Sequence, residues 1–178
     1  MILDTVKAGV LVFVLAVLQV AAAPQLTPTG GGPDFVVILV VALALWRGVE
    51  AAAVAGFAGG MLLDAVLFQH LGTQSLVYVG CAWAVATYAH RGEAGAGMVA
   101  PAPPRPLPWL LAGAALAQVG DVAVQVMLGR GAPVAVILWH QMLPSLIQTT
   151  LIALLLLPLL RRVFRPAHPT DVRRVATA

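Results

Sequence analysis

The sequence predicts an all-α integral membrane protein with six transmembrane helices. Of its 178 residues, 61% are hydrophobic and only 10% are charged, whereas soluble domains average about 45–50% apolar and about 25% charged residues. The apolar runs lack the alternation that is typical of outer-membrane barrel strands. Nine of the 10 lysines and arginines fall on one side of a six-span topology, as the positive-inside rule requires. Residues 1–178 are therefore expected to form a single polytopic membrane domain.

The six spans are expected where apolar runs approach the roughly 20 residues that cross a bilayer as a helix. The first run follows Lys7, which can snorkel to the interface. The last run is long, so we expect it to bend at Pro144. The expected ranges are 6–23, 34–46, 49–68, 72–89, 109–128 and 133–160.

The second span is short, because Phe35–Trp46 reaches only about 18 Å as a helix. Making it re-entrant would invert every later span, and merging it with the third would give a helix about 52 Å long. We therefore expect a hairpin that turns at Trp46-Arg47-Gly48. Pro33 and Asp34 are expected to open the second helix, because proline suits the first helical position and a carboxylate favours the positive end of the dipole.

The charge pattern predicts that both termini lie on the cytoplasmic side of the membrane and that Arg130 alone among the basic residues lies outside. Residues 90–108 are expected to form a Pro-rich cytoplasmic loop, either a plain linker or a docking segment. The basic tail 161–178 is expected to contact anionic lipid headgroups. The N-terminal run also has features of a signal peptide, but Pro24 directly after the Ala21-Ala22-Ala23 site disfavours cleavage.

Asp64 is an ionisable group inside the third span and therefore needs a partner or a cavity. Gly60 and Gly56 precede it by four and eight residues, so all three share one helix face. Two interpretations stay open. The face is either a groove for a partner's helix, or a close-packing surface whose aspartate caps the outer end near water.

Polar stripes on spans five and six are expected to face each other. Gln118, Asp121 and Gln125 share one face of span five, and Gln141, Ser145 and Gln148 share one face of span six beside His140. Hydrogen bonding between the two helices is the simpler interpretation, and a ligand pocket or a partner groove is the alternative. The polar cluster expected in the outer half of the membrane comprises Gln19, Asp64, Asp121, Gln125, His140 and Gln141.

Several chemistries are missing from the sequence. There is no phosphate-binding loop with a lysine, since the single lysine is Lys7, and there is no metalloprotease or serine-hydrolase motif. Cys81 is the only cysteine, which excludes a disulfide framework and a four-cysteine metal site. We therefore expect no catalytic residue, metal site, cofactor or nucleic-acid partner.

The order of several short motifs resembles the MreD family, the small membrane subunit of the bacterial rod-shape system, the elongasome. The resemblance is good over residues 33–91 and loose elsewhere, and Leu67–His70 departs from the small, turn-like residues of the family. The motifs are Pro33-Asp34-Phe35, an apolar run, Trp46-Arg47-Gly48, a glycine-rich helix from Gly56 to Leu62-Leu63-Asp64, and Leu71-Gly72. Leu18-Gln19, Pro144-Ser145-Leu146 and Pro158-Leu159-Leu160 also fit.

This resemblance implies a non-enzymatic scaffold of the bacterial inner membrane. Such a protein would bind MreC directly and act with RodA, a class B penicillin-binding protein and MreB in lateral peptidoglycan synthesis and rod cell shape. The expected contacts for the partner are Gly56, Gly60, Asp64, Pro33 and Asp34. The family is also similar in its six-helix arrangement to the S components of ECF vitamin transporters. A small-molecule-binding transporter subunit is therefore the alternative function.

Overall fold

The structure is a computed structural model that describes residues 2–26, 32–67, 70–90, 106–129 and 142–164. Within these ranges every regular element is a helix, which confirms the predicted all-α class. His140, Gln141, most of the Pro-rich loop and the end of the basic tail lie outside the described residues. The helices are α1 (Ile2–Leu26), α2 (Phe35–Trp46), α3 (Val49–Val66), α4 (Thr73–His90), α5 (Pro106–Met127) and α7 (Leu143–Val163).

Three of the described helices, α3, α5 and α7, are long and apolar enough to cross a membrane. The apolar stretches in α1 and α2 are shorter, Val6–Ala22 and Phe35–Trp46. Helix α4 forms close to its expected range, but polar residues fill its first turn, Thr73-Gln74-Ser75. Membrane-spanning character is therefore clearest for half of the six predicted spans.

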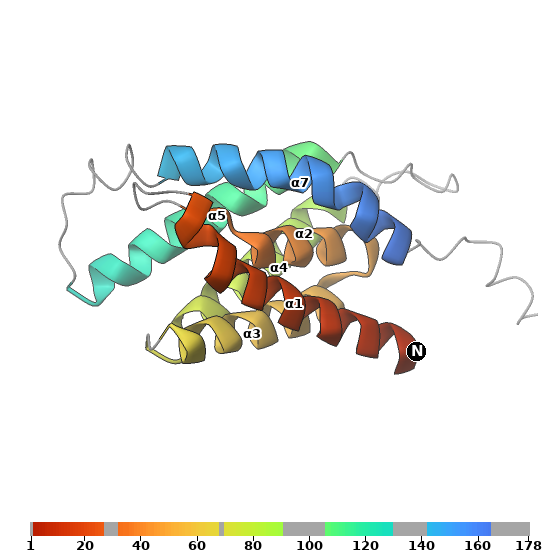
Figure 1. Cartoon of the computed structure of the whole chain (residues 1–178), viewed down its shortest axis with the longest axis horizontal. Helices are drawn as coiled ribbons and strands as arrows, with labels where there is room; N and C mark the ends of the chain where they lie inside the picture. The colour runs from red at the N-terminus through yellow and green to blue at the C-terminus, as the bar shows by residue number, and fades with distance from the viewer. Residues whose placement is uncertain (1, 27–31, 68–69, 91–105, 130–141, 165–178) are drawn as a thin grey trace, which may run out of the picture.

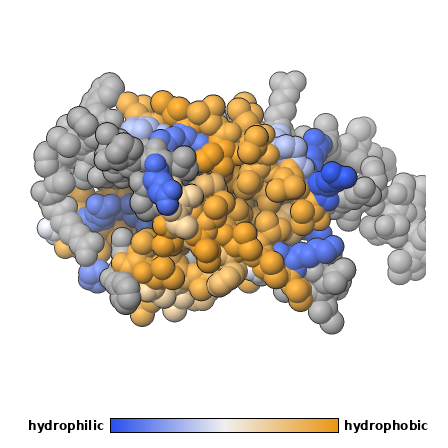
Figure 2. All heavy atoms as spheres, viewed as in Figure 1, coloured by the Kyte–Doolittle hydropathy of each residue, from blue (hydrophilic) through white to orange (hydrophobic). Residues whose placement is uncertain are grey.

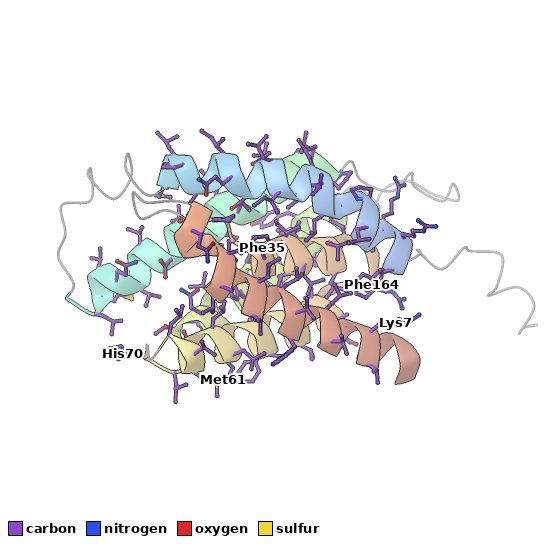
Figure 3. The ribbon with its side chains drawn as sticks, viewed as in Figure 1. Lys7, Phe35, Met61, His70 and Phe164 are labelled. Carbon is purple, nitrogen blue, oxygen red and sulfur yellow. The ribbon has the colours of Figure 1, made fainter. Side chains whose placement is uncertain are left out.

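Successive helices run back and forth along the long axis of the molecule (Figure 1). The start of α1 and the end of α7 lie at one end, marked by Lys7 and Phe164 in Figure 3, and His70 lies at the opposite end. The surface between the two ends is mostly hydrophobic, with hydrophilic residues gathered toward both ends (Figure 2). The described lysine and arginines all belong to the Lys7 end: Lys7, Arg47, Arg161 and Arg162.

Helix α2 lies at the centre of the bundle and contacts each of the other five described helices. Every side chain from Phe35 to Leu45 is buried. A helix that is enclosed on all sides needs no polar face, which explains its uninterrupted apolar sequence. Its 12 residues are sufficient because neighbouring helices, rather than lipid, surround it.

The predicted hairpin between the second and third helices is confirmed. Arg47 N and Gly48 N both donate to Leu43 O, at 2.8 and 3.1 Å, which ends α2. Gly48 has a φ of +90°, a left-handed conformation that L side chains rarely adopt. Helix α3 then begins at Val49.

Two predicted proline positions need correction. Pro33 does not occupy the first helical position, because Asp34 is the N-cap and α2 begins at Phe35. Pro144 lies in the first turn of α7 as the structure describes it, where its missing N–H has no intrahelical partner to lose. The proline inside α7 is Pro158. Residues 133–141 of the expected sixth span lie outside the described residues.

Candidate functional site

The first turn of α2 begins inside the bundle, where its free N–H groups need acceptors other than water. Side chains from two other helices and from the cap residue provide them. Asp34 N donates to Thr149 Oγ1 at 3.0 Å, Val36 N donates to Gln19 Oε1 at 3.1 Å, and Val37 N donates to Asp34 Oδ1 at 3.2 Å. Gln19 comes from α1 and Thr149 from α7, so one helix start joins three helices.

Tyr78 of α4 completes this arrangement. Its hydroxyl lies 3.1 Å from both carboxylate oxygens of Asp34 and donates to them. Gln19 Nε2 in turn donates to the Tyr78 hydroxyl oxygen at 3.5 Å. We refer to Gln19, Asp34, Tyr78 and Thr149 as the α2 cap network. Because each member forms a hydrogen bond with a group from another helix, the network fixes the positions of α1, α2, α4 and α7 relative to one another.

Ser145 and Gln118 anchor the chain just before α2. Ser145 Oγ donates to Gly32 O at 2.8 Å, and Gln118 Nε2 donates to Ser145 Oγ. The predicted hydrogen bonding between the polar stripes of spans five and six is therefore confirmed for this pair. Gln148 belongs to the same α7 stripe, and its buried Oε1 has no hydrogen-bond partner.

Asp64 caps the start of α4 from the end of α3. Its carboxylate accepts hydrogen bonds from Gly72 N at 2.7 Å, Gln74 N at 3.2 Å and Thr73 Oγ1 at 3.3 Å. The aspartate side chain is fully buried, so water does not satisfy it. Asp64 therefore acts as a helix cap, as one of the two interpretations predicted. The helix that it caps is α4, and not the outer end of its own helix α3.

Gln74 links Asp64 to the polar stripe of α5. Its backbone N–H binds Asp64, while its side-chain Nε2 donates to Asp121 Oδ1 at 3.1 Å. The other carboxylate oxygen of Asp121 accepts from Gln125 Nε2 at 3.0 Å. We refer to Asp64, Gln74, Asp121 and Gln125 as the α4 cap network. The described members of the predicted outer polar cluster are thus divided between two networks, and each network surrounds a helix start.

Gly56 and Gly60 form the surface of α3 on which α4 packs. A Cβ on Gly60 would lie 2.5 Å from Ser75 Cα and 2.7 Å from the Gln74 carbonyl carbon. A Cβ on Gly56 would lie 3.2 Å from the backbone of Tyr78. Helix α4 of the same chain therefore fills the predicted partner groove, and Asp64 lies buried beneath it.

Comparison of the chain with protein-family models, with curated proteins and with solved structures found no match. The role of the site therefore rests on its geometry. In the described part of the chain, no three histidine, cysteine, aspartate or glutamate side chains gather as a metal site would require. The carboxylates of Asp34, Asp64 and Asp121 each accept hydrogen bonds from two or more groups of this chain. The arrangement caps and joins helices.

The sequence predicts the three carboxylates of these networks but not all of their hydrogen-bonding partners. Five of the predicted residues lie in the two networks: Gln19, Asp34, Asp64, Asp121 and Gln125. Pro33 is buried beside them, immediately before the α2 cap. The missed residues are Thr73, Gln74, Tyr78 and Thr149. The sequence does contain an indication for Gln74. A membrane helix that begins with Gly-Thr-Gln-Ser needs acceptors for its first N–H groups, so polar partners are expected near this turn.

Replacing Tyr78 by phenylalanine is expected to lower the free energy of unfolding by about 1–3 kcal/mol. The variant leaves both Asp34 oxygens without the phenol donor in a buried site. Titration of sodium dodecyl sulfate into mild-detergent micelles, followed by tryptophan fluorescence, measures the change. Tyr88→Phe is the matched control, since the Tyr88 side chain is 51% exposed, and we expect a change within about 0.5 kcal/mol. Equal effects of the two substitutions would contradict a role for Tyr78 in the cap.

Proposed function

We propose that this chain is a six-span scaffold of the bacterial inner membrane, with both termini cytoplasmic and a role like that of the MreD family. It binds the single transmembrane helix of a bitopic partner, MreC, and thereby joins RodA, a class B penicillin-binding protein and MreB. In this role it helps to direct lateral peptidoglycan synthesis and rod cell shape without catalysing a reaction.

The observation that carries this proposal is the use of the polar groups that lie between the helices. Catalysis or transport needs polar groups that are free to meet a substrate. Here the carboxylates of Asp34, Asp64 and Asp121 are engaged by donors of the same chain. A bundle whose polar interior holds its own helices together presents a defined outer surface, as a scaffold requires.

The motifs behind the MreD resemblance acquire a physical reason from these contacts. The Pro-Asp pair before the apolar run supplies the cap of α2, and the Arg-Gly pair after it forms the turn into α3. The glycine-rich helix lets α4 approach, and its final aspartate caps α4. Each motif thus supplies a cap, a turn or a packing surface of the bundle. The bundle needs these features in a fixed order along the chain, which gives a structural reason for the order and spacing of the motifs.

The grouping of Lys7, Arg47, Arg161 and Arg162 at one end supports a cytoplasmic position for that end, because basic residues remain on the cytoplasmic side. The alternating directions of the helices support the six-span topology. In this topology, helix α2 is the second span, and it is a buried helix that begins inside the protein.

The partner's helix requires an exposed surface, because α4 covers Gly56 and Gly60. Large apolar side chains are exposed on all helices that surround α2. Site-specific photo-crosslinking in native bacterial membranes maps which of these faces meets a partner. One exposed position per helix carries the photo-reactive residue: Val10, Phe57, Leu76, Val119 and Leu155.

We expect one or two adjacent helices to crosslink to a bitopic partner and the others to crosslink only to lipid. Val40, which is fully buried in α2, is the control and is expected to give no crosslink to a partner. Mass spectrometry of the crosslinked product identifies the partner. Absence of any partner crosslink from all five positions, with recovery of a transporter's energising subunit instead, would contradict the scaffold and favour the small-molecule-binding alternative.

A further inference from the structure

A cavity of about 420 Å³ lies at the basic end of the bundle, between α1, α3 and the residue that follows α7. Figure 3 places Lys7 and Phe164 at this end. Leu43 of the buried helix α2 also contributes to the lining. Small side chains leave the space open, and the main wall residues are Ala8, Gly9, Ala51, Ala55, Ala58 and Phe164.

The depth of the cavity corresponds to one leaflet of a bilayer. Its α3 wall runs from Glu50 to Ala58, a rise of about 12 Å. At the next residue, a Cβ on Gly59 would lie 2.7 Å from Val36 Cγ1 and 3.5 Å from Val12 Cγ1. Helices α1, α2 and α3 are therefore in close contact just beyond the cavity. Half of a hydrocarbon core about 30 Å thick is about 15 Å, so the space suits an acyl chain better than a helix that crosses both leaflets.

The charges around the cavity favour an anionic headgroup. Arg47 and Glu50 line it, and Lys7 directly precedes the wall residue Ala8. Arg161 and Arg162 occupy the last turn of α7, before Phe164. Four basic residues thus stand near one described carboxylate. Basic pockets between transmembrane helices on the cytoplasmic side are suited to anionic lipid headgroups.

We propose that this cavity holds one acyl chain of an anionic phospholipid from the cytoplasmic leaflet, with the lipid phosphate contacting Arg47 and Lys7. The inference rests on the membrane insertion in the proposed function and is independent of the partner's identity. A bound lipid fills the space that small side chains leave between α1 and α3. It thereby fixes the position of α1 against the rest of the bundle.

Native mass spectrometry of the full chain in mild detergent tests the proposal. The probes are phosphatidylglycerol and phosphatidylcholine with identical acyl chains. We expect wild-type protein to retain one phosphatidylglycerol and to prefer it to phosphatidylcholine by at least fivefold. Ala58→Phe fills the cavity and is expected to lower this retention at least fivefold. Ala65→Phe, at an exposed position on the same helix outside the cavity wall, is expected to retain lipid as wild type does.

A second set of variants tests the headgroup contact. Arg47→Gln is expected to lower the preference for phosphatidylglycerol about fivefold, the factor that corresponds to the ~1 kcal/mol of one basic residue at an anionic membrane surface. Arg47→Lys keeps the charge and is expected to keep most of the preference. Arg162→Gln removes a charge at the same end but outside the cavity lining and is expected to lower the preference by less than Arg47→Gln does.

Unchanged retention in Ala58→Phe, or equal retention of the two lipids by wild-type protein, would overturn the proposal. Loss of the partner crosslink in Ala58→Phe with lipid retained would also overturn it and assign the cavity to the partner's helix. Retention of lipid by a protein that gives no partner crosslink would support this inference while contradicting the proposed scaffold.

Discussion

Replacing Gly60 by alanine is expected to destabilise the protein by about 3 kcal/mol or more, although the change adds only one methyl group. The new Cβ would lie 2.5 Å from Ser75 Cα and 2.7 Å from the Gln74 carbonyl carbon. Both atoms belong to the backbone at the start of α4, so no side-chain rotation relieves the overlap. Helix α4 must move away from α3, and Asp64 then loses its donors.

A graded series of glycine variants checks this expectation by detergent unfolding. Gly56→Ala is expected to cost less, because its Cβ would meet the Tyr78 backbone at 3.2 Å. Gly80→Ala is the matched control on α4, since nothing lies within 4 Å of its Cβ. It is expected to stabilise the helix by about 0.5–1 kcal/mol. Equal stability of the Gly60 and Gly80 variants would contradict the close packing of α3 on α4.

Replacing Asp64 by alanine is expected to lower the free energy of unfolding by about 3–5 kcal/mol. The variant leaves Gly72 N, Gln74 N and Thr73 Oγ1 without their acceptor in a fully buried site. Each unsatisfied buried donor costs about 1–3 kcal/mol. Helix α4 is the element expected to fray first, because these donors form its opening turn. Hydrogen exchange of the α4 amides therefore should rise together with the loss of stability.

Two further variants separate capping from a general effect of removing charge. Asp64→Asn keeps one carbonyl acceptor and is expected to cost about 1–2 kcal/mol. Glu50→Gln removes a carboxylate from the exposed start of the same helix and is expected to change stability by less than about 0.5 kcal/mol. A loss for Asp64→Ala no larger than that for Glu50→Gln would refute the capping role.

The helical class, the bounds of α2 and the turn at Gly48 were predictable from the sequence because they depend on local properties. An apolar run of about 20 residues indicates a membrane-spanning helix. Asp34 favours the N-cap of a helix, and Gly48 favours a turn, because of the conformational preferences of these residue types. The shortness of α2 was also visible. Its reason was not, because enclosure by five other helices is a property of the assembled bundle.

The candidate site could be predicted only in part. The sequence indicates that Asp64 and the glycines before it share a helix face, but it does not indicate what occupies that face. The folded chain brings α4 onto it and buries the aspartate. Likewise, Gln148 was grouped with Ser145 on one stripe, yet Ser145 binds Gly32 while the Gln148 Oε1 has no partner.

The sequence by itself determined that the chain is helical and highly apolar and that buried carboxylates would need partners. It also placed the described helices to within a few residues, apart from the start of α7, which was expected at 133 and is described from Leu143. Tertiary structure alone decided which partners those carboxylates have. The Asp34 carboxylate accepts from Tyr78, 44 residues away in sequence, and the backbone N–H of the same residue donates to Thr149, 115 residues away. The physical reason is that helix formation and hydropathy act over a few turns of chain, whereas a hydrogen bond between helices requires their packing to place both groups within about 3 Å.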